Sequence, residues 1–243
     1  MTDSLLDPLR SCALEIGAAI NGHQGRGLSG QRATQYHLDL VADEVAVRVL
    51  GGAGFQVISE ESGVTGSGPL SVVVDPIDGS TNCDRGVPFF STSLAVLRGD
   101  EVVAALVMNQ ATGTVYEAEK GNGARRDGLS ISPSGQTEIS KSIVGSSGYP
   151  TRNLGWSQNR SLGAASLEIC LVADGALDVY GVAQHSGLNI WDYLGGLLIA
   201  REAGAAAADY HDEELETSQD VLRHPVFAAT TQLLTFMLGA GPI

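Results

Sequence analysis

The sequence predicts a layered α/β or α+β fold, because helical and strand-like patterns alternate along its 243 residues. Apolar residues recur at helical spacing near both ends of the chain, whereas segments in the middle alternate as antiparallel strands do. There is no internal repeat, low-complexity tract or coiled-coil heptad. Hydrophobic residues make up 43% of the chain and charged residues 17%, which is typical of a globular protein with a buried core.

The N-terminal part is predicted to contain two helices, a glycine-rich loop and a short strand. Apolar residues at helical spacing indicate the helices, and four glycines within nine residues indicate the loop. In chain order the predicted elements are a helix over 4–21, a mobile loop over 22–30, a helix over 38–50 and a strand over 55–58. This strand leads to the acidic pair Glu60-Glu61.

The next predicted strand is central to the rest of the chain. Val72-Val73-Val74 indicate the end of a buried strand. Pro76 has no N–H with which to continue a β ladder, so this strand is predicted to stop at Asp75. Asp78 follows three residues after Asp75, and Gly79-Ser80-Thr81 is predicted to open a short helix beside both carboxylates.

The remaining elements are predicted to form two groups around a joint. Residues 129–157 lack periodicity and are rich in Ser, Gly and Pro, so the chain is divided into halves 1–128 and 129–243 of one compact unit. The first half is completed by strands over 91–97, 102–108 and 114–119 and by the turn-rich stretch 121–128. The second half contains helices over 162–174, 190–203 and 232–238 and a strand over 226–229.

Composition also limits the partners. The net charge of −14 argues against binding a nucleic-acid backbone, because no basic patch is available to release counterions. The same charge repels a phosphorylated substrate at long range, so cations in a site would have to reverse the field locally. The alternative is that the acidic surface only keeps the protein in solution.

Three observations favour a cytoplasmic protein. Cys12, Cys83 and Cys170 are far apart and form no C-x-x-C pattern, which fits a reducing compartment. The first seven residues lack the basic start and apolar core of a signal peptide. No apolar run approaches the roughly 20 residues needed to cross a bilayer, so no membrane partner is expected.

Four acidic positions, each at the end of a predicted element, are the candidate site: Glu60 (with Glu61), Asp75, Asp78 and Asp192. Like charges held together destabilise one another unless one carboxylate is protonated or a cation lies between them. A hard divalent cation removes this conflict, and the N–H groups of a helix N-terminus bind phosphate. The pattern therefore predicts a metal-assisted phosphate site.

Simpler interpretations exist for each motif taken alone. Asp192 opens an apolar helix and would suit an N-cap or a partner of the helix dipole. Glu60-Glu61 would suit a solvated turn, and Asp75-Pro76-Ile77-Asp78-Gly79 a tight turn. Other site types are excluded by spacing: the chain has no P-loop, no zinc-binding pattern, no EF-hand, no G-x-S-x-G elbow and no complete dinucleotide fingerprint.

These residues resemble the inositol monophosphatase family of lithium-sensitive, magnesium-dependent phosphatases. The resemblance rests on Glu60-Glu61-Ser62, the segment from Asp75 to Asn82, and Trp191-Asp192, in the expected order. Weaker matches lie between them, so the resemblance covers nearly the whole chain. It implies a layered α-β-α-β-α sandwich in which the second half contributes Asp192.

The resemblance also implies a role for each site residue. Asp75 would bridge two Mg²⁺ ions, one held also by Glu60 and the Ile77 carbonyl and the other by Asp78 and Asp192. A third, weaker Mg²⁺ would use Glu60. Gly79 and Ser80 would present backbone N–H groups to the phosphate. The Ser80 hydroxyl and Glu60 would orient and deprotonate the attacking water, with Asp43 supporting that hydroxyl. These roles agree with the preference of Mg²⁺ for oxygen ligands and with the electrostatic demands of phosphoryl transfer.

The chain also departs from the family pattern. Leu40 and Leu194 replace the usual Thr and Ala, and the segment from Tyr149 to Leu162 is shorter than usual, so a helix is expected to be missing there. His185 stands where inositol-type enzymes carry an acidic residue, and Arg32 loosely replaces an upstream basic residue. Either His185 or Arg32 is a candidate substrate contact, and His185 is equally well explained as a surface or packing residue.

The sequence thus predicts a Mg²⁺-dependent phosphomonoesterase acting on a small phosphorylated polyol or sugar, with inositol monophosphate the default substrate. The first alternative is a bisphosphate phosphatase acting on fructose 1,6-bisphosphate or 3′-phosphoadenosine 5′-phosphate. The second is a non-catalytic relative that binds phosphates or partners. The family likeness also implies a homodimer.

Overall fold

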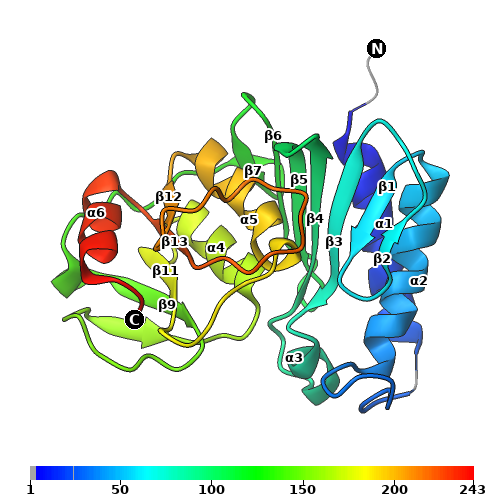
Figure 1. The fold of residues 1–243 in the computed structure, drawn as a ribbon, viewed down its shortest axis with the longest axis horizontal. Helices are drawn as coiled ribbons and strands as arrows, with labels where there is room; N and C mark the ends of the chain where they lie inside the picture. Colours follow the sequence, from blue (N-terminus) through cyan, green and yellow to red (C-terminus); the bar gives the residue numbers. More distant parts are fainter. Residues whose placement is uncertain (1–3, 24) are drawn as a thin grey trace.

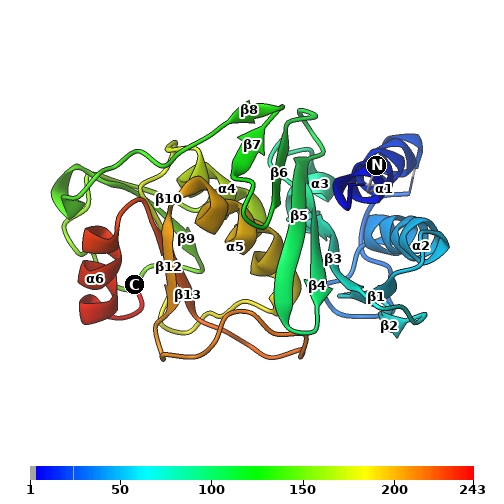
Figure 2. The same cartoon turned by 90° about the horizontal axis from the view of Figure 1, so that it is seen from above.

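The computed structural model describes residues 4–23 and 25–243, so the first three residues and position 24 of the predicted glycine loop lie outside the description. Two sheets and the helices around them form five layers, which confirms the α-β-α-β-α sandwich (Figures 1 and 2). In order these layers are α1 with α2, the larger sheet, α4 with α5, the smaller sheet, and α6.

Six α-helices and one 3₁₀ helix are present in the described residues. They are α1 (Leu6–Gly22), α2 (His37–Gly52), α3 (Ser80–Arg85), η1 (Ile139–Lys141), α4 (Ala165–Ala173), α5 (Ile190–Ala203) and α6 (Thr231–Ala240). The predicted helices agree with α1, α2, α4, α5 and α6 to within a few residues. As predicted, Gly79-Ser80-Thr81 leads into a short helix, α3.

The larger sheet has eight strands in the described residues, in the order β2-β1-β3-β4-β5-β6-β7-β8. They are β1 (Gln56–Ser59), β2 (Gly63–Thr65), β3 (Ser71–Asp78), β4 (Ser91–Arg98), β5 (Glu101–Asn109), β6 (Val115–Glu119), β7 (Ala124–Arg126) and β8 (Leu129–Ser130). β1 and β3 pair in parallel, and the other neighbours pair antiparallel. This antiparallel series follows from the alternating segments of the sequence.

The smaller sheet contains five strands of the described chain, in the order β10-β9-β11-β13-β12. They are β9 (Ile143–Ser147), β10 (Gln158–Arg160), β11 (Val179–Val182), β12 (Ala206–Asp209) and β13 (Pro225–Ala228). The stretch 129–157, predicted as a joint between two halves, runs from β8 of the larger sheet to β9 of the smaller one and also contains η1, so it holds more regular structure than its composition indicated. Ser and Gly in β9 hid a strand that is stabilised by its neighbours in the sheet.

The prediction that Pro76 ends the central strand was also wrong. β3 continues to Asp78, with a register shift in its pairing to β4 between Asp75 and Asp78. Asp75 lies opposite Ser93 and Asp78 opposite Ser91, so three steps along β3 match two along β4. The extra residue of this bulge accommodates a proline that donates no hydrogen bond.

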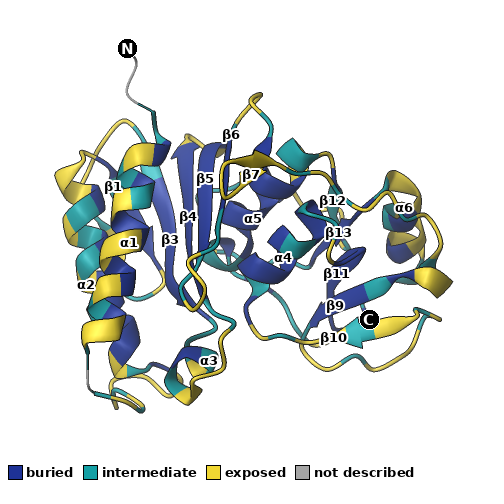
Figure 3. Ribbon diagram, turned by 180° about the vertical axis from the view of Figure 1, so that it is seen from behind, coloured by how far each residue is buried: buried dark blue, intermediate teal, exposed yellow. Residues whose placement is uncertain are grey.

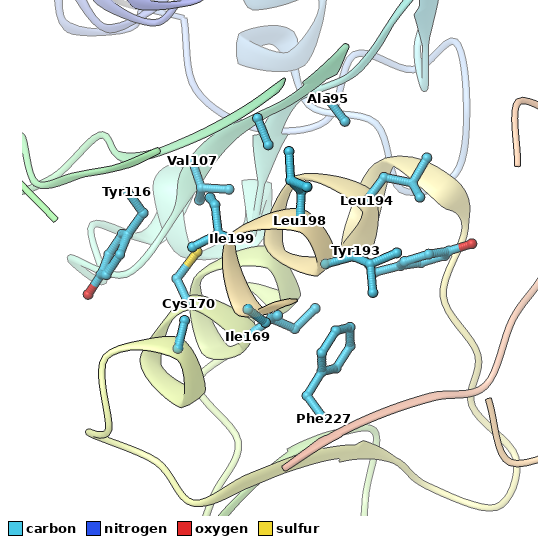
Figure 4. Close-up of a cluster of buried hydrophobic side chains, with 14 of the residues drawn as sticks. Ala95, Val107, Tyr116, Ile169, Cys170, Tyr193, Leu194, Leu198, Ile199 and Phe227 are labelled. Atoms are coloured by element: carbon cyan, nitrogen blue, oxygen red, sulfur yellow. The ribbon is translucent and has the colours of Figure 1, made fainter. Parts of the chain in front are cut away.

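Alternate residues of the larger sheet pack against different helices. Val72, Val74 and their equivalents on β4 and β5 face α1 and α2. Val73 and Val107 belong to the cluster formed with α4 and α5, and Figure 4 shows Val107 facing these helices. α5 is buried on nearly every side between the two sheets (Figure 3), as its almost wholly apolar sequence indicates. The middle layer therefore connects the sheet that carries Asp75 to the rest of the chain.

Candidate active site

Asp75 and Asp78 point to the same face of the larger sheet, the face covered by α4 and α5. Without the bulge, residues three apart would point to opposite faces. Because their partners on β4 are two apart, the bulge restores Asp75 and Asp78 to one face. On this face the Ser91 hydroxyl contacts that of Ser166 on α4 at 2.9 Å. The Asp-Pro-Ile-Asp segment therefore works as a paired carboxylate unit because of its proline bulge.

Asp78 connects this strand to the N-terminus of α4. Its carboxylate accepts hydrogen bonds from the backbone N–H groups of Ala165 at 3.1 Å and Ser166 at 2.7 Å, and from the Ser166 hydroxyl at 2.5 Å. Burial raises the pKa of Asp78 to about 6, and these hydrogen bonds oppose the rise. An anion at a helix N-terminus also interacts favourably with the helix dipole.

Asp192 enters the site from the first turn of α5. One carboxylate oxygen accepts a hydrogen bond from the Asn189 N–H at 2.7 Å, so Asp192 does cap its own helix, as its simpler interpretation anticipated. Burial and the neighbouring Asp78 raise its pKa to about 7. Asp192 is therefore both a helix cap and a member of the acidic cluster.

Glu60 and Asp75 complete the cluster. Burial, and then the charge of Asp192, raise the pKa of Glu60 to about 8. Asp75 is fully buried, and burial together with Glu60, Asp78 and Asp192 holds its pKa well above the usual range. Four acids from three separate segments, β3, the turn after β1 and the first turn of α5, therefore act on one another electrostatically.

The acidic cluster fits the chemistry of a divalent cation site. Buried carboxylates that raise one another's pKa are stabilised by a cation, and oxygen is the ligand that Mg²⁺ prefers. In the part of the chain that the structure describes, no three acidic, histidine or cysteine side chains are gathered as a finished ligand set. Asp78 and Asp192 instead direct oxygens to the N-termini of α4 and α5. A carboxylate oxygen that accepts one hydrogen bond still has a second lone pair for a cation.

Gly79 allows the chain to turn from β3 into α3. Its φ of 83° lies in the left-handed region, and a Cβ there would meet the Gly163 carbonyl at 2.7 Å. Asn82 fixes the same corner by donating to the carbonyls of Phe89 and Leu162, both at 2.7 Å. The first turn of α3, which begins at Ser80, is thereby held beside Asp78 with its N–H groups unpaired within the helix.

The acid beside Ser80 is Asp39, and the expectation that Asp43 supports Ser80 needs correction. Burial raises the pKa of Asp39 to about 7, and the Tyr36 N–H, which donates to Asp39 Oδ2 at 2.7 Å, and the nearby Ser80 hydroxyl oppose the rise. No well-formed hydrogen bond joins Asp39 to Ser80, because Asp39 Oδ1 is buried without a partner in the described residues. Asp43 instead accepts hydrogen bonds from the hydroxyls of Ser59 at 2.5 Å and Ser62 at 3.1 Å. Because α2 begins at His37, Asp39 lies in its first turn and Asp43 lies one turn further along.

Two cavities border the acidic cluster. The first, of about 310 Å³, is lined by Asp78 and Asp192 together with polar residues of the second half of the chain. The second, of about 490 Å³, is lined by Glu60, Arg32, Trp191 and Asp220 among others. The acids therefore lie between two spaces that can hold different parts of a ligand.

The two predicted substrate contacts lie in different surroundings. Arg32 donates to the backbone carbonyls of Glu60 at 3.2 Å and Glu61 at 2.8 Å, so it is at the rim of the site. His185 is exposed and lines a separate surface pocket with Tyr149. Only Gly148 is common to that pocket and to the cavity beside Asp78. Arg32 is thus brought to the acidic cluster, and His185 lies further out.

The sequence reasoning missed Glu168 and Tyr180, which line the cavity beside Asp78. Glu168 is a fully buried acid on α4, and burial raises its pKa to about 8. The sequence does contain an indication of Glu168, because this acid interrupts an otherwise apolar predicted helix in the same way as Asp192. Tyr180 had no such signal, since buried tyrosines are common in cores.

Comparisons with known proteins identify the family. The sequence model of the inositol monophosphatase family matches residues 31–238. A fructose-1,6-bisphosphatase/inositol-1-monophosphatase of Archaeoglobus fulgidus is 35% identical, over 86% of this chain and 79% of that protein. An inositol-1-monophosphatase of Mesorhizobium japonicum is 27% identical, over 95% and 93%.

The fold has known relatives as well. A solved structure from Pyrococcus horikoshii, described as similar to inositol-1 monophosphatase, superimposes with a TM-score of 0.84 at 25% identity over 96% of this chain and 98% of that one. No helix within the described residues is both long and apolar enough to span a bilayer. With the family match spanning most of its length, the chain belongs to the inositol monophosphatase family and is a phosphatase that hydrolyses phosphate monoesters.

Proposed function

We propose that this phosphatase depends on Mg²⁺ and hydrolyses a small phosphorylated polyol or sugar, with inositol monophosphate as the default substrate. The observation that carries the proposal is the buried set Glu60, Asp75, Asp78 and Asp192 beside Gly79-Ser80. The relatives named for inositol-1-monophosphate hydrolysis support the choice of substrate class.

The residues that would hold the cations are acids and one carbonyl. Asp75 would contribute to holding two ions, one together with Glu60 and the Ile77 carbonyl and the other together with Asp78 and Asp192. A third, weaker ion would depend on Glu60. When bound, the cations neutralise the phosphate charge and activate water.

The remaining roles belong to the chain itself. The backbone N–H groups at Gly79 and Ser80 hold the phosphate oxygens, because they are unpaired at the start of α3. The Ser80 hydroxyl and Glu60 orient the attacking water and accept its proton. Asp39, beside Ser80, takes the supporting role that the sequence assigned to Asp43, and Asp43 braces the segment that carries Glu60.

A bisphosphatase is the second candidate, and Arg32 is the observation that favours it. Arg32 lines the cavity that contains Glu60, and the planar fork of its guanidinium, which pairs with the Glu61 carboxylate at 3.5 Å, suits phosphate oxygens. The Archaeoglobus relative is named for both activities. If a second phosphate binds here, Arg32→Ala should lower kcat/KM for fructose 1,6-bisphosphate about tenfold more than for inositol 1-phosphate.

We also propose a cytoplasmic location and a homodimer. All three cysteines are free and buried, which supports a reducing compartment. The homodimer rests on the family likeness alone. A non-catalytic role is disfavoured, because a buried acidic cluster without cations is destabilising and would have no function to maintain it.

The test is phosphate release from a panel of sugar, polyol and nucleotide monophosphates and of bisphosphates, with Mg²⁺ and with a chelator. We expect turnover of polyol or sugar monophosphates that requires Mg²⁺. Isothermal titration of the chelated protein with Mg²⁺ provides a second readout that does not depend on choosing the right ester. Turnover that is unaffected by the chelator, or no turnover of any ester together with no Mg²⁺ binding, would refute the proposal.

A further inference from the structure

The start of α4 has no cap from its own segment. Its N-cap residue is Ala164, which has no side-chain oxygen and makes no capping hydrogen bond. The first N–H groups of a helix have no partner within the helix, so those of Ala165 and Ser166 need an acceptor from elsewhere. Asp78 of β3 supplies it, because its Oδ1 accepts the Ala165 N–H at 3.1 Å and its Oδ2 accepts the Ser166 N–H at 2.7 Å. The position of Asp78 is therefore fixed by the helix that it caps.

Two serine hydroxyls extend this contact with Asp78. The Ser166 hydroxyl donates to Asp78 Oδ2 at 2.5 Å, and the Ser91 hydroxyl lies 2.9 Å from that of Ser166 and 3.4 Å from Asp78 Oδ2. Because Ser166 gives its one hydroxyl proton to the carboxylate, the Ser91 proton completes the contact between the two hydroxyls. Both serines are 0% exposed and Asp78 is 6% exposed, so these hydrogen bonds lie in surroundings that strengthen them.

The two oxygens of Asp78 therefore differ in the capacity that they have left. A carboxylate oxygen offers about two lone pairs. Those of Oδ2 are both used by Ser166, one by its N–H and one by its hydroxyl. Oδ1 accepts only the Ala165 N–H among the described residues, so one lone pair remains there. Turning Oδ2 towards a cation would leave both buried donors of Ser166 without a partner, which is costly.

We propose that Ser166, supported by Ser91, restricts Asp78 to one oxygen as a cation ligand and so makes the site selective for Mg²⁺ over Ca²⁺. This inference rests on the proposed function, in which Asp78 and Asp192 hold one of the cations. Mg²⁺ demands nearly octahedral coordination and keeps several waters, so a carboxylate that offers one oxygen suits it. Ca²⁺ takes about 6–8 oxygens and commonly uses both oxygens of a carboxylate. An Asp78 that cannot turn its second oxygen therefore disfavours Ca²⁺.

Asp78 is more constrained by hydrogen bonds than the neighbouring aspartates of the cluster. Asp192 accepts one hydrogen bond, from the Asn189 N–H to Oδ2, and Asp75 accepts one, from the Ile77 N–H to Oδ1. Among the described residues, neither of these two acids has both lone pairs of one oxygen occupied. The serine pair therefore acts at the aspartate whose coordination it is able to limit.

The test is isothermal titration of the metal-free protein with Mg²⁺ and with Ca²⁺, in the absence of any ester. The variants are Ser166→Ala and Ser91→Ala, and the measured quantity is the ratio of the Kd for Ca²⁺ to the Kd for Mg²⁺. The control is Ser142→Ala, which removes another serine hydroxyl at a position that is 0% exposed. The Ser142 hydroxyl donates to the Glu138 carbonyl at 2.9 Å and makes no hydrogen bond to the acidic cluster.

We expect Ser166→Ala to lower this ratio about tenfold, because Oδ2 then keeps only its N–H donor and has a lone pair free for Ca²⁺. Ser91→Ala should lower the ratio about threefold, since it removes only the support of the Ser166 hydroxyl. Ser142→Ala should leave the ratio at the wild-type value. A merely structural role of the serine pair would lower the thermal midpoint of the metal-free protein and weaken both cations alike, so the ratio would not move.

A wild-type ratio in Ser166→Ala, from a protein that binds Mg²⁺ and hydrolyses a phosphate ester, would overturn the inference and leave the proposed function standing. A wild-type protein that neither binds Mg²⁺ nor hydrolyses any ester would count against the proposed function, and the inference would fall with it. If Ser166→Ala does not fold, the ratio measured for Ser91→Ala decides the outcome alone, and an unchanged ratio there overturns the inference.

Discussion

At the scale of single residues, Asp75 is the acid on which the proposed cation site would depend most. It is fully buried, and its Oδ1 accepts only the Ile77 N–H at 3.1 Å among the side-chain hydrogen bonds of the described residues. A buried carboxylate with so little compensation is costly to keep unless a cation is bound. Its burial is therefore explained by the proposed cation site and not by a contribution to stability.

Asp75→Asn should abolish turnover and leave the fold intact. Asparagine conserves the shape and can still accept the Ile77 N–H, but it removes the negative charge that a bridging ligand needs. Without cations, the variant should melt at the same or a higher temperature than the wild type, because one buried charge is gone. Phosphate release and the thermal midpoint in a chelator are the measurements. Retained activity would contradict the bridging role of Asp75.

Asp39, which lies beside Ser80 in place of the expected Asp43, provides a second prediction. Ser80→Ala and Asp39→Asn should each lower kcat by about 10²-fold, since both act on the group that positions the attacking water. The double variant should be little worse than either single one, because the two residues act as a unit. Asp43→Asn is the matched control on the same helix.

Asp43→Asn should affect stability more than turnover, because Asp43 bonds to Ser59 and Ser62 and not to Ser80. Steady-state kinetics of the four variants at saturating Mg²⁺ would check both predictions. A larger loss of kcat in Asp43→Asn than in Asp39→Asn would restore the assignment made from the sequence.

At the scale of secondary-structure elements, the site is made by how strands and helices end. The bulge in β3 turns two acids to one face, Gly79 starts α3, and the N-termini of α4 and α5 hold Asp78 and Asp192. The ending at Asp192 is local, because its partner Asn189 is three residues away, whereas the ending at Asp78 depends on a partner far away in the sequence. Ala165 and Asp78, for example, are 87 positions apart.

Gly79 should tolerate alanine much less well than Gly86 at the other end of α3. Both have left-handed φ values, 83° and 74°, so each substitution costs about 1–2 kcal/mol in backbone strain. Only at Gly79 would the new Cβ also clash, with the Gly163 carbonyl and with Ala164. Gly79→Ala should therefore cost at least about 1 kcal/mol more in unfolding free energy and lose most activity. Equal losses of unfolding free energy for Gly79→Ala and Gly86→Ala in urea titrations would contradict this prediction and show that the turn at Gly79 relaxes to accept the new Cβ.

At the scale of the whole molecule, the middle layer joins the two sheets and completes the site. α4 and α5 pack between the larger sheet, which carries Asp75 and Asp78, and the smaller sheet, which carries Tyr180 (Figures 1 and 4). A cation bound by residues of several layers stabilises the whole chain, because it binds the folded state only. The stability of the folded state should therefore depend both on bound Mg²⁺ and on pH.

Stability without cations should fall as pH rises from about 4 to about 8. Glu60, Asp39, Asp78 and Asp192 have pKa values raised to about 8, 7, 6 and 7 in the fold. The folded state thus holds more protons than the unfolded chain in this window, and the stabilisation from protonation is lost as pH passes through the folded pKa values. Mg²⁺ binds the ionised acids, so its stabilising effect should grow over the same range.

Thermal midpoints with a chelator and with Mg²⁺, measured from pH 4 to pH 9, would check this prediction. Asp75→Asn is the control, because it removes one member of the cluster and should flatten the chelator profile. A midpoint in chelator that rises steadily from pH 4 to pH 8 would contradict it.

Much of the fold could be predicted because its strongest signals are local. Helical periodicity located α1, α2 and α5, and alternation located β4, β5 and β6 to within a few residues. β9, β10 and β12 were missed because their short or polar sequences take strand form only through pairing within the smaller sheet. At Pro76 the local signal was itself misleading. A proline usually ends a strand, but here the bulge in the pairing of β3 with β4 lets the strand continue past it.

The sequence by itself determined the family and the layered fold, and it singled out Glu60, Asp75, Asp78 and Asp192 as the candidate site, because these follow from motif order and from residue types that are rare at the ends of buried elements. Only the tertiary structure decided that Asp39 and not Asp43 approaches Ser80, and that Glu168 and Tyr180 share a cavity with Asp78. Helical phase and contacts between distant segments set these positions, and side-chain type and spacing along a chain do not encode them.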